Sequence, residues 1–479
     1  MISENSSNSI AARALATIRV GLFLVMLATV AALILRSLPV SWDAIPAAAV
    51  VLSLVAALYL VLATKSASYD PTRIAFGSAL VIWMFLLDSE ELFSRSEGNL
   101  QSVLQERFSV DAYGELGLWV VAFLVLLVFF LRNNAYIRQM FSGQYRWVSV
   151  FCVFCVLSTA QSPRPLYSMA WAFKLCLVVL LLAMCSTLIR DRGKLMAFLR
   201  ATLWACLFYL VAEVYIGFAN PSAAFEGGRF GQSTNSLSVI AGTVLILSLT
   251  LRSQIIGVWR LVISIFALTI MILSGGKAGI VSGALSATLF YLIKKKVGYA
   301  VALLSGMACL GVALYVLTPL GSYFNTYAEE GGAETLSGRT DLWGGALPLI
   351  RQHVILGQGY LASRFASIQM EGVHWEADHM HNAFLDVLYN NGLIGLGLVL
   401  ILHAMIIRNL LHIITYPGVQ HELYDVAAGA MAMYINLVTS SFFNSTIGSR
   451  PSTLFMLFLA LIVVSESLGR ELTKNCKSR

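Results

Sequence analysis

Residues 297–318 read VGYAVALLSGMACLGVALYVLT and carry no charged side chain. A second stretch, residues 118–131 (LWVVAFLVLLVFFL), is free of charge as well. A helix of about 20 predominantly apolar residues crosses the core of a bilayer, and it satisfies its backbone hydrogen bonds internally where no water is present. These stretches therefore predict helices that span a membrane.

The composition of the chain also indicates a lipid environment. Of its 479 residues, 58% are hydrophobic and only 12% are charged, whereas about a quarter of the residues of a soluble domain are charged. The formal net charge is +7. The basic residues lie mainly in the loops between the apolar stretches and do not indicate a surface for nucleic acid. We expect the lipid bilayer as a partner and no nucleic acid.

The apolar stretches continue along the chain. About fourteen of them are candidate spans, so we expect an all-α fold, a polytopic bundle of transmembrane helices with one large, partly helical periplasmic loop. The two shortest candidates are Trp147–Ala160 and Ala278–Ile293. The candidates are centred near residues 26, 53, 82, 124, 153, 179, 207, 243, 264, 285, 308, 395, 434 and 459.

The loops between these spans differ in charge. When alternate loops are assigned to opposite faces, one face receives about twice as many lysines and arginines as the other, and such a bias marks the cytoplasmic side. We therefore expect both termini in the cytoplasm. A miscount by one span would move Lys294, Lys295 and Lys296 to the outer face, which the same rule disfavours.

The longest polar segment, Pro319–Met380, lies on the predicted outer face. Long loops without structure of their own are uncommon and often functional. Within it, Arg339–Val354 is expected to form an amphipathic helix that Pro348 kinks or divides, and the glycines at 357 and 359 are expected to stop it. The apolar face of this helix would consist of Trp343, Ala346, Leu347, Ile350 and Val354, at spacings of three and four residues.

Four segments on the predicted outer face combine a cation or a histidine with glycine or small polar residues. Arginine presents a planar fork of donors that fits a phosphate, glycine lets the backbone approach closely, and helix N-termini favour anions. Any one of the cations alone is as commonly an interfacial anchor, but the set predicts a diphosphate site at the membrane surface. The segments are GGRFGQSTN (227–235), SGGKAG (274–279), SGRTDLW (337–343) and DHMHN (378–382).

His381 in the last segment is the candidate general base. An imidazole titrates near neutrality and can take a proton from an acceptor hydroxyl; the structural alternative is an interfacial histidine. Asn382 and Asp386 are candidates to orient its ring. The neighbouring acidic and histidine residues match no metal motif, so we expect no metal ion and no cofactor. These neighbours are Glu376, Asp378 and His379.

A different reading of the chain starts from its intramembrane charges. Glu213 lies deep in a predicted span and is either a functional carboxylate or the partner of Lys174 in another span. A transporter built on such charges would show paired broken spans and internal symmetry. The sequence shows neither, and a transporter would leave the outer cationic segments unexplained.

The order of these motifs resembles the core of the O-antigen ligase and polymerase superfamily. The likeness covers about residues 220–400 and is most specific where GRTDLW, GQGY, HNAFL and GLIGL follow one another between Gly338 and Leu396. It divides the chain into N-terminal transmembrane helices (1–218), a ligase-like core (219–407) that includes the periplasmic loop 319–380, and C-terminal transmembrane helices with a basic cytoplasmic tail (408–479).

By this resemblance, the protein is expected to be a metal-independent, inverting glycosyltransferase of the bacterial inner membrane, with its active site on the periplasmic face. The donor would be an undecaprenyl-diphosphate-linked glycan. The acceptor would be a hydroxyl on a glycan or on the lipid A core, and a chain-length regulator is a further candidate partner.

The resemblance also assigns roles to residues. Arg229 and Arg339 would hold the donor diphosphate, and His381 would activate the acceptor hydroxyl. Where the family often has an arginine, this chain has Lys277, which keeps the charge but lacks the bidentate fork. The diphosphate and the glycan would be contacted by Lys277, Asn235, Trp343, Asn382 and Tyr360.

The superfamily contains two kinds of enzyme. Polymerases join repeat units on the lipid carrier, and ligases pass the finished polymer to the lipid A core. The number of spans and the sizeable loop near Glu90 favour a polymerase for O-antigen or exopolysaccharide. A ligase is the alternative, and a membrane transporter is the alternative of another class.

Overall fold

A computed structural model provides the fold of the chain. It describes residues 127, 131, 134–189, 191–219, 230, 234–255, 257–329, 338–370, 379–445 and 451–477. All of them belong to one compact unit, Phe123–Arg479, which is the subject of the following paragraphs. The four predicted spans centred before residue 130 lie outside the described residues, and so does Arg229.

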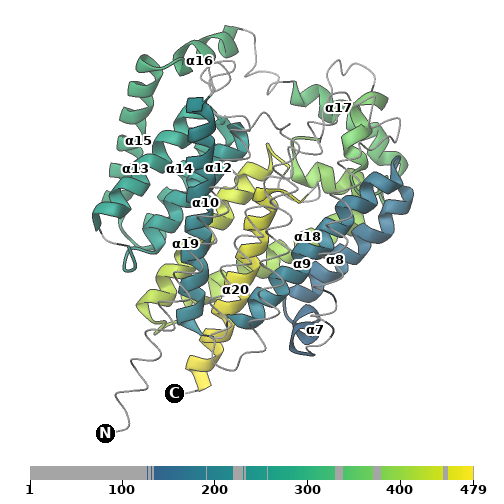
Figure 1. The fold of residues 1–479 in the computed structure, drawn as a ribbon, viewed down its shortest axis with the longest axis horizontal. Helices are drawn as coiled ribbons and strands as arrows, with labels where there is room; N and C mark the ends of the chain where they lie inside the picture. The colour runs from purple at the N-terminus through teal and green to yellow at the C-terminus, as the bar shows by residue number, and fades with distance from the viewer. Residues whose placement is uncertain are drawn as a thin grey trace. The chain divides into compact units, whose positions relative to one another are not determined.

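The described part of the chain consists of helices and contains no strand, which confirms the all-α class (Figure 1). Two short 3-10 helices, η1 and η3, accompany the α-helices. The elements are α7 (Asn134–Met140), α8 (Tyr145–Ser158), η1 (Thr159–Gln161), α9 (Pro165–Leu188), α10 (Arg192–Ala219), α12 (Thr234–Thr250), α13 (Gly257–Leu273), α14 (Lys277–Ile293), α15 (Val297–Leu317), α16 (Leu320–Glu329), α17 (Arg339–Gln352), η3 (Ala362–Gln369), α18 (Ala383–Thr415), α19 (His421–Ser441) and α20 (Thr453–Lys477).

The ten predicted spans centred from residue 153 onward each coincide with one helix: α8, α9, α10, α12, α13, α14, α15, α18, α19 and α20. Among the described residues, five helices (α9, α10, α15, α18 and α20) are long and apolar enough to cross a membrane. The pair α7 and α8 also passes when taken together, with a bend of 81° at the break. The membrane bundle is therefore supported, and the total of about fourteen spans stays a prediction.

Exposed apolar side chains cover the outside of α13 and α15. Trp259 and Ile265 on α13 are 59% and 52% exposed, and Val312 and Val316 on α15 are 65% and 70% exposed. A soluble protein rarely leaves so much contiguous apolar surface in water, whereas acyl chains solvate it in a bilayer. The exposed surface of these two helices is therefore of the kind that lipid solvates.

Helices α12, α14 and α19 pack closely through small and polar residues. A Cβ atom added at Gly242 of α12 would lie 3.3 Å from the Cα atom of Gly283 in α14. The side-chain amide of Asn436 in α19 donates to the carbonyl oxygen of Val239 at 2.9 Å and accepts from the hydroxyl of Ser282 at 2.8 Å. Small residues and interhelical hydrogen bonds hold helices together in lipid, where apolar burial contributes little.

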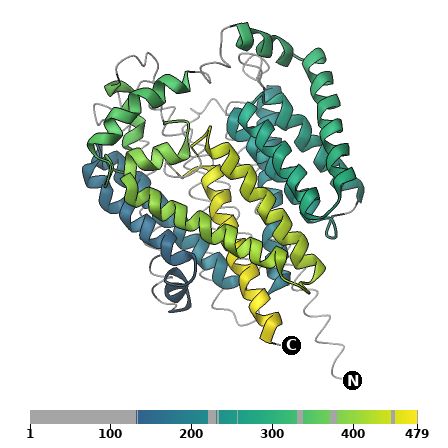
Figure 2. The same cartoon turned by 180° about the vertical axis from the view of Figure 1, so that it is seen from behind.

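Loops that the charge rule assigns to the cytoplasm lie together at one end of the bundle. Arg192, the first residue of α10, donates to Gln420, the residue before α19, at 2.9 Å. Asp425 of α19 contacts Lys294 at 2.6 Å and Arg252 at 3.4 Å. The alternation of the helices is therefore self-consistent, while α16 and α17 lie at the end away from the C-terminal end of α20 (Figures 1 and 2). Which end faces the cytoplasm stays a prediction.

Helix α18 is interrupted at Gly392, whose φ of 61° and ψ of −164° are not helical. The loop after α17 bonds to the backbone at this interruption: the amide of Gly359 donates to the carbonyl of Asn390 at 2.9 Å, and the amide of Leu393 donates to the carbonyl of Val354 at 2.8 Å. A break in a membrane helix is tolerated where other groups satisfy the freed backbone. The outer loop supplies those groups here.

The predicted loop helix is present as α17 and begins at Arg339, as expected, but it ends at Gln352. Pro348 lies inside it and does not divide it. Two members of the predicted apolar face, Ala346 and Ile350, are buried as expected, whereas Leu347 is 46% exposed. The third buried side chain of α17 is Leu342, which the pattern did not include.

Candidate functional site

The first two predicted segments meet at the N-terminal ends of α12 and α14. The amide of Phe230 donates to the carbonyl of Leu273, the last residue of α13, at 3.0 Å. A Cβ atom at Gly276 would lie 2.7 Å from the carbonyl oxygen of Thr234, the first residue of α12. Both helices therefore begin at the same place, with their N-terminal amides at one surface, an arrangement that favours anions.

Asn235 and Lys277 occupy the first turns of these two helices. The backbone carbonyl of Asn235 accepts from the hydroxyl of Ser238 at 2.8 Å, and the residue is half-buried. Lys277 is the first residue of α14, directly after Gly276. The structure therefore places both predicted phosphate-contacting residues at helix N-termini.

Two tyrosines of α16 surround the side chain of Lys277. Its ammonium group donates to the hydroxyl of Tyr323 at 2.5 Å and lies 3.2 Å from the centre of the Tyr327 ring. An ammonium over an aromatic face is attracted by the negative face of the ring quadrupole. The lysine is therefore held in one orientation by a hydrogen bond and a cation–π contact.

Arg339 lies near the same tyrosines. It is the first residue of α17 and follows Gly338, whose φ of 78° is left-handed. Burial lowers the pKa of Arg339, and the hydroxyl groups of Tyr327 and Tyr323 act in the opposite direction. A guanidinium stays protonated in proteins, so Arg339 and Lys277 are two positive charges near one pair of phenol groups.

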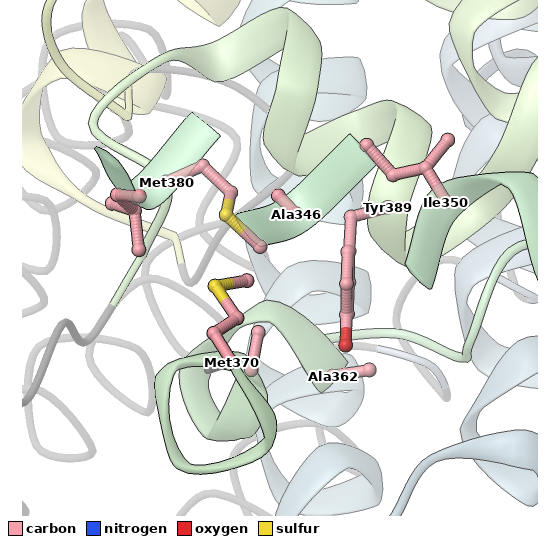
Figure 3. Close-up of a cluster of buried hydrophobic side chains, with 8 residues drawn as sticks. Ala346, Ile350, Ala362, Met370, Met380 and Tyr389 are labelled. Carbon is pink, nitrogen blue, oxygen red and sulfur yellow. The ribbon is translucent and has the colours of Figure 1, made fainter. Parts of the chain in front are cut away.

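The third and fourth segments are joined through Trp343. Its indole Nε1 donates to the carbonyl oxygen of Met380 at 2.8 Å. Met380 is fully buried in a cluster with Ala346 of α17, Met370 and Tyr389 (Figure 3). This cluster fixes the chain immediately before His381.

His381 has an unusual backbone conformation. Its φ of 49° lies in the left-handed region, which side chains other than glycine adopt at a cost and which often marks functional positions. Its amide donates to Nδ1 of His379 at 3.3 Å, and the two imidazole rings meet edge to face with centres 4.0 Å apart. This backbone conformation is maintained by the fixed positions of the neighbouring residues, Met380 and Asn382.

Asp386 and Asn382 hold these flanking residues. Asp386 is fully buried; one carboxylate oxygen accepts from the amide of Met380 at 3.0 Å and the other accepts from the hydroxyl of Ser445. Asn382 caps α18, and its side-chain oxygen accepts from two amides in the first turn, with the nearer, that of Phe384, at 3.0 Å. Both residues therefore order the backbone around His381, and Asn382 has a clear capping role.

Tyr360 lies in the protein interior and is 1% exposed. Burial raises its pKa, and its carbonyl accepts from the hydroxyl of Ser168 at 2.6 Å. Ser162 lies directly against Gly359. We therefore assign Tyr360 to anchoring the outer loop on α9, and its predicted contact with substrate finds no support in this position.

Sequence reasoning missed the contribution of α16. Tyr323 and Tyr327 are four residues apart, a spacing that places both on one face of a helix, but within the long loop only Arg339–Val354 was expected to be helical. Arg364 is 9% exposed, with its guanidinium carbon 5.6 Å from the centre of the Tyr167 ring.

Metal and intramembrane charge were the remaining expectations. Within the described residues, no group of three histidine, cysteine, aspartate or glutamate side chains is arranged to hold a metal ion; Glu376 and Asp378 lie outside those residues.

Lys174 is 3% exposed and its ammonium lies 4.6 Å from the centre of the Trp171 ring. Its pairing with Glu213 stays a prediction.

Residues 261–400 match the model of the O-antigen ligase family. The match confirms the resemblance to the O-antigen ligase and polymerase superfamily over this segment. It runs from α13 to the middle of α18 and includes Lys277, Arg339, Trp343 and His381, whereas Asn235 lies before it. A search of curated proteins gave no match.

Proposed function

We propose that this chain, whose residues 261–400 match the O-antigen ligase family, is a membrane glycosyltransferase of surface polysaccharide assembly. It would transfer a glycan from undecaprenyl diphosphate to the hydroxyl of an acceptor sugar. One observation carries the proposal: the helix that begins at Arg339 is bonded through Trp343 to the residue before His381, which links a candidate phosphate ligand to the candidate base.

The proposed chemistry follows from this arrangement. The acceptor oxygen attacks the anomeric carbon of the donor sugar while the bond from that carbon to the phosphate oxygen breaks, with inversion. His381 takes the proton of the acceptor hydroxyl, a contribution of about two to four orders of magnitude in general base catalysis. Lys277 and Arg339, with Arg229 as a further cation, neutralise the charge that develops on the departing diphosphate. This scheme uses no metal ion.

The neighbouring residues would align the two substrates. Trp343 presents a partly buried ring beside the base, and Asn235 lies at the N-terminus of α12, where a phosphate oxygen is favoured. Holding donor and acceptor in line lowers the barrier in addition to the charge stabilisation. Asn382 and Tyr360 support the site from the cap of α18 and from the loop.

We infer a polymerase of O-antigen or exopolysaccharide as the specific activity, because of the expected number of spans and the long loop near Glu90. The name of the matched family favours the alternative, a ligase that transfers polymer to the lipid A core. In either case the protein would lie in the bacterial inner membrane with the site on the periplasmic face and both termini in the cytoplasm.

The test is the size profile of undecaprenyl-linked glycans in a strain that lacks the gene. Accumulated single repeats indicate a polymerase, and accumulated long polymer on the carrier indicates a ligase. The parent gene should restore the profile, whereas Arg339→Ala and His381→Ala should not. Arg351→Ala is the matched control, since Arg351 lies in the last turn of the same helix. An unchanged profile with Arg339→Ala at normal protein level contradicts the enzyme proposal.

A further inference from the structure

Lys277 is at a disadvantage as a phosphate ligand. A lysine carries a compact charge on a flexible four-carbon chain and lacks the rigid fork with which arginine meets two phosphate oxygens. An unrestrained lysine also loses side-chain entropy when it is ordered. A site that uses lysine at this position therefore gains from neighbours that fix the ammonium group before the substrate arrives.

The contacts of Lys277 meet this requirement. The Tyr323 hydroxyl accepts a hydrogen bond from Nζ at 2.5 Å, which sets one direction of the ammonium group. The Tyr327 ring, 3.2 Å from Nζ at its centre, sets a second, and Phe324 lies farther away, 6.0 Å from Nζ at its ring centre. An acceptor and an aromatic face together leave the ammonium donors in a restricted set of directions.

The helix that carries these tyrosines is held by other contacts. Gly321 at its start is buried against the carbonyl of Tyr315, where a Cβ atom would overlap the carbonyl oxygen. The hydroxyl of Tyr315 donates to Oδ1 of Asn325 at 2.7 Å. Because α15 fixes α16 independently of Lys277, the tyrosines act as the frame and the lysine is the group that they orient.

A second cation, Arg339, lies near the same phenol groups. Two like charges near one site repel each other, and polar groups in their vicinity offset part of that cost before an anion binds.

We propose that Tyr323 and Tyr327 are positioning residues for the donor diphosphate, which hold Lys277 in a fixed direction and supply the geometry that an arginine would have carried itself. This inference rests on the proposed function, because it concerns the substrate of the same site. On this proposal, α16 makes a lysine competent as a diphosphate ligand.

The experiment measures binding of undecaprenyl diphosphate to the full-length protein in detergent by native mass spectrometry. Tyr323→Phe removes the acceptor for the ammonium and should weaken binding about 5- to 10-fold. Tyr327→Leu removes the aromatic face and should weaken binding about 3- to 10-fold. Tyr327→Phe keeps the ring and should retain most of the affinity of the parent. Tyr299→Phe, at the opposite end of α15, is the matched control and should bind as the parent does.

A double-mutant cycle separates positioning from general damage. If the tyrosine compensates for the missing fork, then in a Lys277→Arg background the change Tyr323→Phe should alter binding less than about 2-fold. An equal loss in both backgrounds overturns the inference, and so does a loss in Tyr323→Phe that is matched by a lower melting temperature. Binding unchanged by Tyr323→Phe and Tyr327→Leu overturns it as well.

Failure of this inference is distinct from failure of the proposed function. Arg339→Ala provides the distinction, since it tests the diphosphate site itself. If Arg339→Ala abolishes binding and the tyrosine variants do not affect it, the site stands and only the role of α16 is wrong. If Arg339→Ala also leaves binding and the glycan profile unchanged, the proposed function is wrong.

Discussion

The indole nitrogen of Trp343 donates a hydrogen bond of 2.8 Å to the carbonyl oxygen of Met380. Trp343 lies one turn after Arg339 on α17, and Met380 precedes His381 in the chain. One hydrogen bond therefore connects the helix that carries a candidate phosphate ligand to the backbone of the candidate base. The relative placement of these two groups depends on it.

Removing this bond should impair turnover. Trp343→Phe keeps an aromatic ring and loses the donor, and a net contribution of about 1 kcal/mol for such a bond corresponds to a loss of about 5-fold in the transfer rate. The measurement is the rate of glycan transfer from a lipid-linked donor in membrane vesicles. Trp259→Phe on the lipid-facing surface of α13 is the control, and a parental rate in Trp343→Phe would show that the bond does not position the base.

Asp386 should be needed for stability as well as for activity. Asp386→Ala leaves the buried amide of Met380 and the hydroxyl of Ser445 without their acceptor, at a cost of about 1–3 kcal/mol for each unsatisfied buried group. We expect a lower melting temperature in detergent and a large loss of transfer. Asp386→Asn keeps one carbonyl acceptor and should lie between the parent and the alanine variant. The idea fails if the two variants melt at the same temperature as the parent.

A side chain at Gly392 should prevent correct folding. Its φ of 61° favours glycine, and an added Cβ atom would overlap the carbonyl oxygen of Ile355. Gly392→Ala should sharply reduce the yield of monodisperse protein in size-exclusion chromatography. Gly397→Ala in the same helix is a close control, because its Cβ atom would meet no described atom within 4 Å. Equal yields from the two variants would show that the break in α18 is not required.

The orientation of the bundle can be tested by labelling. Thr326 on α16 and Ser253 after α12 are at least partly exposed and belong to opposite ends of the bundle. In spheroplasts, a membrane-impermeant maleimide should label Thr326→Cys above the background of the parent chain and should label Ser253→Cys only after the membrane is opened. The reverse pattern would place the candidate site in the cytoplasm and contradict the charge-based topology.

The helices were predictable because lipid restricts the chain to few solutions. A chargeless stretch such as Val297–Leu317 has no alternative to a helix in a bilayer, and the start of α17 at Arg339 follows from the glycine before it. The buried face of α17 was predicted correctly at Ala346 and Ile350, but the prediction missed Leu342. Trp343 counted as an apolar residue in the pattern, but its indole nitrogen turns to the carbonyl of Met380, and Leu342 takes the inward position.

The site was predictable only in part. Arginine, lysine and histidine carry their chemistry wherever they lie, so Lys277 and His381 could be selected from the sequence. The contact between Lys277 and Tyr323 joins residues 46 positions apart and depends on how α14, α15 and α16 pack, which no local pattern encodes. Asp386 was a candidate to orient the ring of His381, although its position five residues on does not imply a contact, and its carboxylate accepts from the amide of Met380, the residue before His381.

The bonds at Gly392 have a consequence for how the protein is made. The ribosome synthesises Val354–Gly359 before Asn390 and Leu393, and on the charge-based topology this segment lies on the far side of the membrane from the ribosome. Until the segment is in place, the carbonyl of Asn390 and the amide of Leu393 do not have the partners that the folded structure gives them. Completion of α18 and placement of the preceding loop are therefore coupled steps of folding.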